Sequence, residues 1–181
     1  MQEMGTVDDF SLFLASRRST RDFLPDPVPV EMIEQIIQDG LTAPSWSNTR
    51  PFVVAIATGE VRDRLSEEFL RRWNAVKDFR GSLRKIGSIF KRYGFPTSNW
   101  LVVKKYHKDL LPRSKKIGKD LYAHMGIERQ DKEARDGFWA RNYEFFGAPV
   151  ELFLFTHKSL GKFAASDAGL FMQNLILSAH S

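Results

Sequence analysis

Two short apolar stretches, residues 52–58 and 150–156, constrain the fold more than any other feature of this sequence. They read FVVAIAT and VELFLFT, and both are rich in β-branched and aromatic residues without a regular polar alternation. Such runs are typical of strands buried on both faces of a sheet. Two strands rarely form an independently stable sheet, so the chain is expected to lack further strands of its fold.

Helical periodicity surrounds both stretches. Apolar residues recur every three or four positions after the capping-box sequence Thr6–Asp9, after Pro29 and after Gly59. A further helix is predicted over 131–146, and Ser166-Asp167 is predicted to cap a last apolar helix. That helix reaches Ser181 without a glycine cap, which predicts that C-terminal elements are missing. We therefore predict one α+β domain over 1–181, with a central mixed or antiparallel sheet flanked by helices.

Composition excludes several kinds of site. The 181 residues include no cysteine, which excludes disulfides and thiolate chemistry, and the four histidines show no ligand spacing, so no metal site is expected. The start lacks a signal-peptide pattern and no apolar run approaches the roughly 20 residues of a membrane span. A cytoplasmic protein without membrane contact is expected.

Positive charge is concentrated in one segment. The net charge is +5, yet residues 77–132 carry 15 Lys and Arg against 5 Asp and Glu. Glycine and proline interrupt short apolar pieces here, so residues 77–130 are predicted to form a basic excursion with short helices inside the single domain.

The N-terminal third holds the strongest chemical signal. Arg17-Arg18-Ser19-Thr20-Arg21 follows the first predicted helix, and the loop Ala43–Phe52 (APSWSNTRPF) follows the second. Arginine forks form bidentate, charge-assisted hydrogen bonds with phosphate oxygens, and hydroxyl groups fill the remaining acceptor sites. The cluster therefore predicts a binding site for a phosphate ester.

In this order and spacing, the Arg-Arg-Ser-x-Arg-x-Phe motif, the Pro27-Val28-Pro29 helix entry and the Ala-Pro-Ser-x-x-Asn-x-x-Pro-Phe loop resemble the nitroreductase family. The resemblance implies a homodimer with FMN at the subunit interface and NADH or NADPH as electron donor. It places the phosphate and ribityl end on Arg17, Arg18, Ser19 and Arg21. It places the flavin ring near Pro44, Ser45, Trp46 and Asn48, typically of the partner subunit, and near Arg50, where most relatives have glutamine.

A second resembling passage is Arg141–Pro149 (RNYEFFGAP), which in the family supplies an asparagine to the pyrimidine edge of the flavin. Asn142 is the candidate, although an asparagine near a helix end equally often caps backbone groups. No catalytic side chain is expected from the protein itself, because the flavin performs the chemistry. Gln173 and Asn174 are expected to bind neighbouring backbone or a dimer contact rather than a cofactor.

The implied function is reduction of nitroaromatics, quinones or similar electron-poor aromatics in two hydride-transfer steps. Tyr93-Gly94-Phe95 and Glu144–Pro149 resemble a branch of the family linked to nitrobenzoate-type substrates, and the basic segment is a candidate attractant for carboxylates. Two alternatives stay open. One is a flavin-family relic or fragment without cofactor, and the less favoured one is a nucleic-acid-binding module built on residues 77–132.

Overall fold

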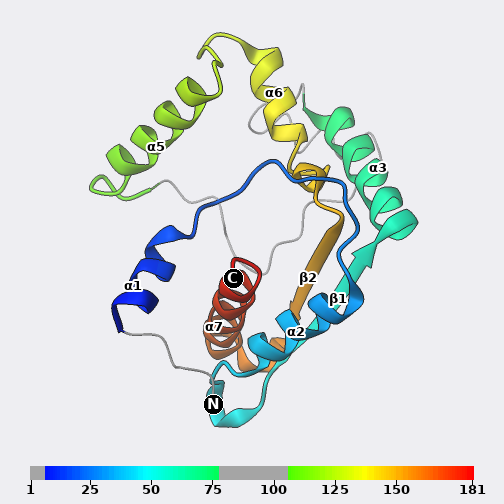
Figure 1. The fold of residues 1–181 in the computed structure, drawn as a ribbon. Helices are drawn as coiled ribbons and strands as arrows, with labels where there is room; N and C mark the ends of the chain where they lie inside the picture. Colours follow the sequence, from blue (N-terminus) through cyan, green and yellow to red (C-terminus); the bar gives the residue numbers. More distant parts are fainter. Residues whose placement is uncertain (1–6, 78–105) are drawn as a thin grey trace. The chain divides into compact units, whose positions relative to one another are not determined.

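A computed structural model describes residues 7–77 and 106–181 (Figure 1). The chain divides into two compact units, one comprising the residues up to Asp63 and from Gly147 onward, the other Arg64–Phe146. The single domain predicted over 1–181 stays a prediction. In chain order, the elements are α1 (Val7–Ser16), α2 (Val30–Leu41), η1 (Trp46–Asn48), β1 (Phe52–Thr58), α3 (Gly59–Val76), α5 (Leu111–His124), α6 (Lys132–Ala140), η2 (Phe145–Gly147), β2 (Val150–Thr156), η3 (Lys158–Leu160) and α7 (Lys162–Ser178).

The two predicted strands are confirmed and pair with each other. β1 and β2 run antiparallel over their whole length, with Phe52 opposite Thr156 and Thr58 opposite Val150. Burial on both faces is wrong for the described residues, because Val53 is 67% exposed and Phe155, its partner across the pair, is 57% exposed. Successive side chains of a strand point to opposite faces, so Val53 and Phe155 lie together on the face away from α2 and α7, where they are exposed although Ala57 on the same face is buried.

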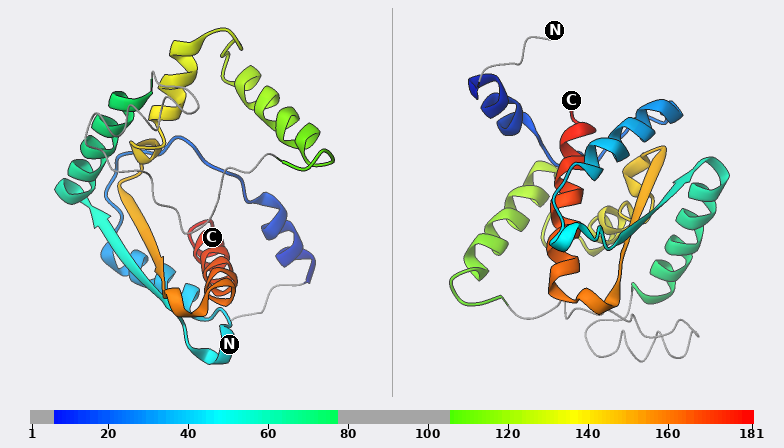
Figure 2. Two further views of the ribbon diagram at one scale, coloured as in Figure 1. Left: turned by 180° about the vertical axis from the view of Figure 1, so that it is seen from behind. Right: turned by 90° about the horizontal axis from the view of Figure 1, so that it is seen from below.

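That covered face packs on α2 and α7. Phe171 of α7 is fully buried (0% exposed), and with Leu175 and Ala43 it forms the core of this unit. Apolar side chains of α2, β1 and β2 surround it, namely Ile36, Ile37, Leu41, Phe52, Val54, Leu152 and Leu154. Figure 2 shows α2 and α7 crossing each other beside the strand pair. The two helices and the strand pair thus form a two-layer core.

The crossing of α2 and α7 depends on Gly40. A Cβ atom at this position would lie 2.6 Å from Leu175 Cδ2 and 2.8 Å from Phe171 Cε2. Overpacking of this kind costs about 1–3 kcal/mol, which exceeds the roughly 0.8–1 kcal/mol that alanine gains over glycine inside a helix. Gly40→Ala should therefore lower the free energy of unfolding, measured by urea denaturation.

Gly137→Ala is the matched control, because this glycine lies inside α6 and no described atom is within 4 Å of its added Cβ. Helix propensity alone then decides the outcome, and the variant should gain up to about 1 kcal/mol. A Gly40→Ala protein as stable as the wild type would contradict the tight helix crossing.

The second unit contains α5, α6 and most of α3. Trp73 of α3 is buried and its ring lies 5.5 Å from that of Tyr143, measured between centroids. The Asp131 side chain caps α6 by accepting a hydrogen bond from the Ala134 amide at 2.8 Å. The helix predicted as far as Phe146 ends at Ala140, and turns follow over residues 141–144. It could not have included Phe145 and Phe146, because their positive φ angles of 53° and 54° are not allowed in an α-helix. Residues 78–105 of the basic excursion, including Tyr93-Gly94-Phe95, lie outside the described residues.

Glu151 of β2 gives the fold a pH dependence. Burial raises the pKa of this carboxyl above its ordinary value, and the nearby Arg62 guanidinium opposes the shift. A raised pKa means that the folded chain binds the proton more readily than the unfolded chain. The stabilisation is therefore complete below the unfolded carboxyl pKa of about 4.3 and is lost as the pH rises through the folded value.

Glu151→Gln removes this titration. Compared with the wild type, the variant should become progressively more stable as the pH rises from about 4 to 7, because only the wild type must bury a charge at neutral pH. Urea denaturation at both pH values measures the difference in the free energy of unfolding. The exposed Glu67→Gln is the control, and an equal trend in both variants would refute the role of burial at Glu151.

Candidate functional site

The arginine segment lies just after α1, as predicted. α1 ends at Ser16, and the chain continues without regular structure to Pro29. Ser16 Oγ lies 2.8 Å from His180 Nε2, and the rings of Phe13 and His180 have centroids 5.6 Å apart. The end of α1 is thereby attached to the C-terminal end of α7, and the cations are presented from the irregular segment that follows.

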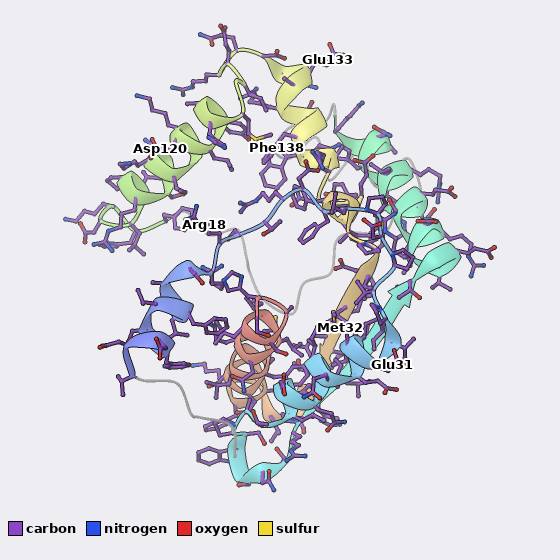
Figure 3. All side chains as sticks on the ribbon, in the orientation of Figure 1. Arg18, Glu31, Met32, Asp120, Glu133 and Phe138 are labelled. Carbon is purple, nitrogen blue, oxygen red and sulfur yellow. The ribbon has the colours of Figure 1, made fainter. Side chains whose placement is uncertain are left out.

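Among the described residues, the positive charges of this segment have no carboxylate partner. Arg17 is half-buried, whereas Arg18, Ser19 and Arg21 are exposed, and Figure 3 shows Arg18 on the stretch between α1 and α2. Arg21 Nη1 donates a weak hydrogen bond to the Ser19 carbonyl oxygen at 3.3 Å. Within residues 7–77 and 106–181, no ion pair involves any of the three arginines. Their guanidinium groups are available to an anionic ligand.

The second motif forms a tight turn from Pro44 to Arg50, which we call the Pro44–Arg50 turn. Ser45 Oγ accepts a hydrogen bond from the Arg50 amide at 2.9 Å, which closes the turn on itself. Ser47, Asn48 and Arg50 have positive φ angles of 51°, 53° and 44°. A residue with a Cβ atom pays roughly 1–2 kcal/mol in this left-handed region, asparagine less than most. The turn therefore needs support from outside.

α7 supplies that support. The Trp46 amide donates a hydrogen bond to Asp167 Oδ2 at 3.0 Å, and the Trp46 ring stacks on Phe163 with centroids 4.3 Å apart. The indole nevertheless remains 53% exposed. A flat aromatic surface at the edge of a fixed turn suits contact with another flat ring.

The structure does not bring the two motifs together within one chain. The Pro44–Arg50 turn contacts Asp167 near the start of α7, whereas the arginine segment begins beside His180, just past its end. Eleven residues separate Asp167 from Ser178, which corresponds to roughly 17 Å along a helix rising 1.5 Å per residue. Figure 1 shows η1 and the stretch after α1 at opposite ends of α7.

Asn142 lies in the other compact unit, at the C-terminal end of α6. Its Nδ2 donates a hydrogen bond to the Trp139 carbonyl oxygen at 3.0 Å, and the residue is exposed. This is the backbone-capping contact that the sequence left as one of two alternatives. A contact between Asn142 and a flavin stays a prediction.

Sequence reasoning missed the part that Asp167 and Phe163 play. Ser166-Asp167 was predicted to start the last helix, but α7 begins at Lys162 after Gly161, whose φ is 50°. Asp167 therefore lies inside the helix, and its carboxylate is a tertiary partner of Trp46 rather than a cap. The available signal was a single acidic residue within an otherwise apolar helix, four residues after an aromatic one.

The antiparallel strand pair covered by two crossing helices belongs to a chain whose structure matches those of FMN-dependent nitroreductases. NfnB from Mycobacterium smegmatis, solved in complex with NADPH, matches with a TM-score of 0.74 at 28% identity over 94% of this chain and 69% of that chain. The FMN- and NADPH-dependent nitroreductase NfnB from Sphigopyxis sp. strain HMH matches with a TM-score of 0.71 at 32% identity, covering 93% and 69%.

The sequence comparisons also match this chain to nitroreductases. The 4-nitrobenzoate reductase of Pseudomonas putida is 33% identical over 175 residues, which cover 97% of this chain and 69% of the relative, and the Nitroreductase family profile matches residues 14–85. The chain belongs to the nitroreductase family, as the motifs between Arg17 and Phe52 predicted. It spans about two thirds of the length of the curated relatives it matches, between 63% and 69%.

Proposed function

We propose that this chain is an FMN-dependent NAD(P)H oxidoreductase that reduces nitroaromatic or similar electron-poor aromatic compounds. The observation that carries the proposal is the group of three arginines after α1 that form no ion pair within the described residues, in a chain of the nitroreductase family. The Pseudomonas putida relative is named as a reductase of 4-nitrobenzoate, which favours a carboxylated nitroaromatic among the candidate substrates.

The residues present fit FMN at both of its ends. Arg17, Arg18 and Arg21 would provide charge-assisted hydrogen bonds to the phosphate, and the Ser19 hydroxyl would bind a further oxygen or the ribityl chain. The exposed indole of Trp46 would lie against the flat ring, with Pro44, Ser45 and Asn48 holding the turn beside it.

When bound, FMN supplies hydride transfer between NAD(P)H and the aromatic acceptor. The protein's contribution is then to orient and to stabilise charge. A cation such as Arg50 near the pyrimidine edge would stabilise negative charge there, since a fixed donor in a site shielded from water interacts more strongly than one in bulk water. Trp46 and Phe163 would exclude water from one face of the site.

The same proposal includes a homodimer with the site at the subunit interface. It is supported by the roughly 17 Å along α7 that separates the two motifs within one chain. Several exposed apolar side chains are candidates for burial against a partner subunit, namely Val53, Phe155, Leu170, Met172 and Ile176. None of the described helices combines the length and apolar character needed to cross a membrane. The cytoplasmic location stays a prediction.

The colour of the purified protein tests this function. A yellow preparation whose visible absorbance bleaches on anaerobic addition of NADPH, and recovers on addition of a nitrobenzoate, is the expected result. A colourless protein that takes up no added FMN would refute the proposal and favour a relic without cofactor. Salt-sensitive retention of an oligonucleotide would instead favour nucleic-acid binding by the basic segment.

A further inference from the structure

Asp167 is a buried carboxylate that the proposed cofactor contacts do not use. It is 4% exposed and lies in α7 among apolar residues such as Ala164, Ala168 and Phe171. A carboxylate is rarely this buried unless it is paired. Within the described ranges, it forms no ion pair with any lysine, arginine or histidine. The partner that the structure gives it is a backbone amide, that of Trp46, at 3.0 Å.

This hydrogen bond holds the first residue of η1. The Pro44–Arg50 turn contains three non-glycine residues in the left-handed region, a conformation that persists only when surrounding contacts enforce it. Phe163 supplies the second contact by stacking on the Trp46 ring at 4.3 Å. Phe163 and Asp167 are four residues apart and so lie on one face of the helix. One face of α7 thus holds both the backbone and the side chain of Trp46.

Capping of its own helix does not explain why a carboxylate is buried at position 167. α7 begins at Lys162, five residues before Asp167, so this side chain is too far along the helix to cap its first amides. It binds an amide 121 residues earlier in the chain instead. Its described role is therefore to connect α7 to the turn.

We propose that Asp167 is a positioning residue, which fixes the Pro44–Arg50 turn in the orientation that presents Trp46 and Asn48 to the flavin ring. The inference rests on the proposed function. Asp167 acts through the Trp46 amide and needs no contact of its own with the cofactor. The requirement is an acceptor oxygen at this point, so asparagine should largely replace it.

The test compares Asp167→Ala, which removes the acceptor, with Asp167→Asn, which retains one. Hydrogen exchange of a peptide spanning residues 44–52, recorded without FMN, reports whether the turn is held. The dissociation constant of FMN and its visible spectrum on the protein report whether the turn matters to the cofactor. Loss of a hydrogen bond to a charged acceptor predicts an affinity about tenfold lower or more in the alanine variant.

Asn174→Ala is the control on the same helix. Asn174 Nδ2 donates to Thr42 Oγ1 at 3.1 Å and to the Asp39 carbonyl oxygen at 3.4 Å, which confirms its predicted role toward neighbouring backbone. Its loss weakens the contact between α7 and α2 without touching the turn. It should leave the exchange of residues 44–52 and the flavin spectrum unchanged.

Faster exchange, weaker FMN binding and an altered spectrum in Asp167→Ala, all largely restored by asparagine, are the expected results. If the alanine variant does not fold, Asp167→Leu, which fills the same space without an acceptor, takes its place and must show the same faster exchange and weaker FMN binding. Wild-type affinity in a folded variant that lacks the acceptor overturns the inference while leaving the proposed function intact. A wild-type protein that binds no FMN refutes the proposed function, and the positioning role with it, whatever the exchange data show about the turn.

Discussion

Replacing Arg17 and Arg21 together with alanine should weaken FMN binding by about a hundredfold or more, since each hydrogen bond between a guanidinium group and a phosphate contributes about 1.5 kcal/mol or more. The two side chains form no ion pair with a described carboxylate, so their removal leaves no described aspartate or glutamate without its ion-pair partner. The loss should therefore appear in ligand affinity rather than in the stability of the fold.

Titration of the unliganded protein with FMN, followed by flavin fluorescence, measures this affinity. Riboflavin is the matched ligand, because it has the same ring and ribityl chain without the phosphate, and its affinity should hardly change. Arg64→Ala combined with Arg129→Ala is the matched variant, since it removes the same charge at two other exposed positions. Equal losses for FMN and riboflavin, or equal losses in both double variants, would place the phosphate elsewhere.

Local sequence predicted the elements well where burial and backbone preference agree. The runs at 52–58 and 150–156 match β1 and β2 at both ends, and Pro29 directly precedes α2. β-branched residues favour strands, and proline fixes the φ angle that a first helical turn requires. The predictions failed where a distant contact decides the backbone. The helix predicted over 131–146 ends at Ala140 and could not have included Phe145 and Phe146, because both have positive φ angles although neither is a glycine.

The candidate site likewise has features that local sequence predicted and features that it did not. The segment at Arg17–Arg21 and the Pro44–Arg50 turn were predicted from contiguous motifs, and both have the expected local form. Their separation along α7 and the contact between Asp167 and Trp46 depend on tertiary packing, so the residues of each motif alone do not specify them. Burial on both faces of the sheet was overestimated for a related reason. An apolar strand pattern indicates that a face of the sheet is covered, but it does not indicate whether the same chain or a partner subunit covers it.

Complementation between two defective chains tests whether each FMN pocket takes its two motifs from one chain or from two. One carries Arg17→Ala and Arg21→Ala, and the other carries Trp46→Ala and Asn48→Ala, so neither homodimer should bind FMN tightly. If each pocket takes its arginines from one protomer and its turn from the partner, a heterodimer of the two variants contains one pocket with both motifs intact. A heterodimer isolated through two different tags should then recover about half of the FMN sites of the wild-type dimer.

The reciprocal heterodimer makes the result decisive. A chain with all four substitutions, paired with a wild-type chain, has a defect in both shared pockets and should bind almost no FMN. If each pocket instead used both motifs of one chain, the wild-type protomer would keep one intact site, and the first heterodimer would have none. The two arrangements thus predict opposite results in the same pair of preparations. The separation of the two motifs by most of the length of α7 favours the shared pocket, because a single FMN molecule must contact both.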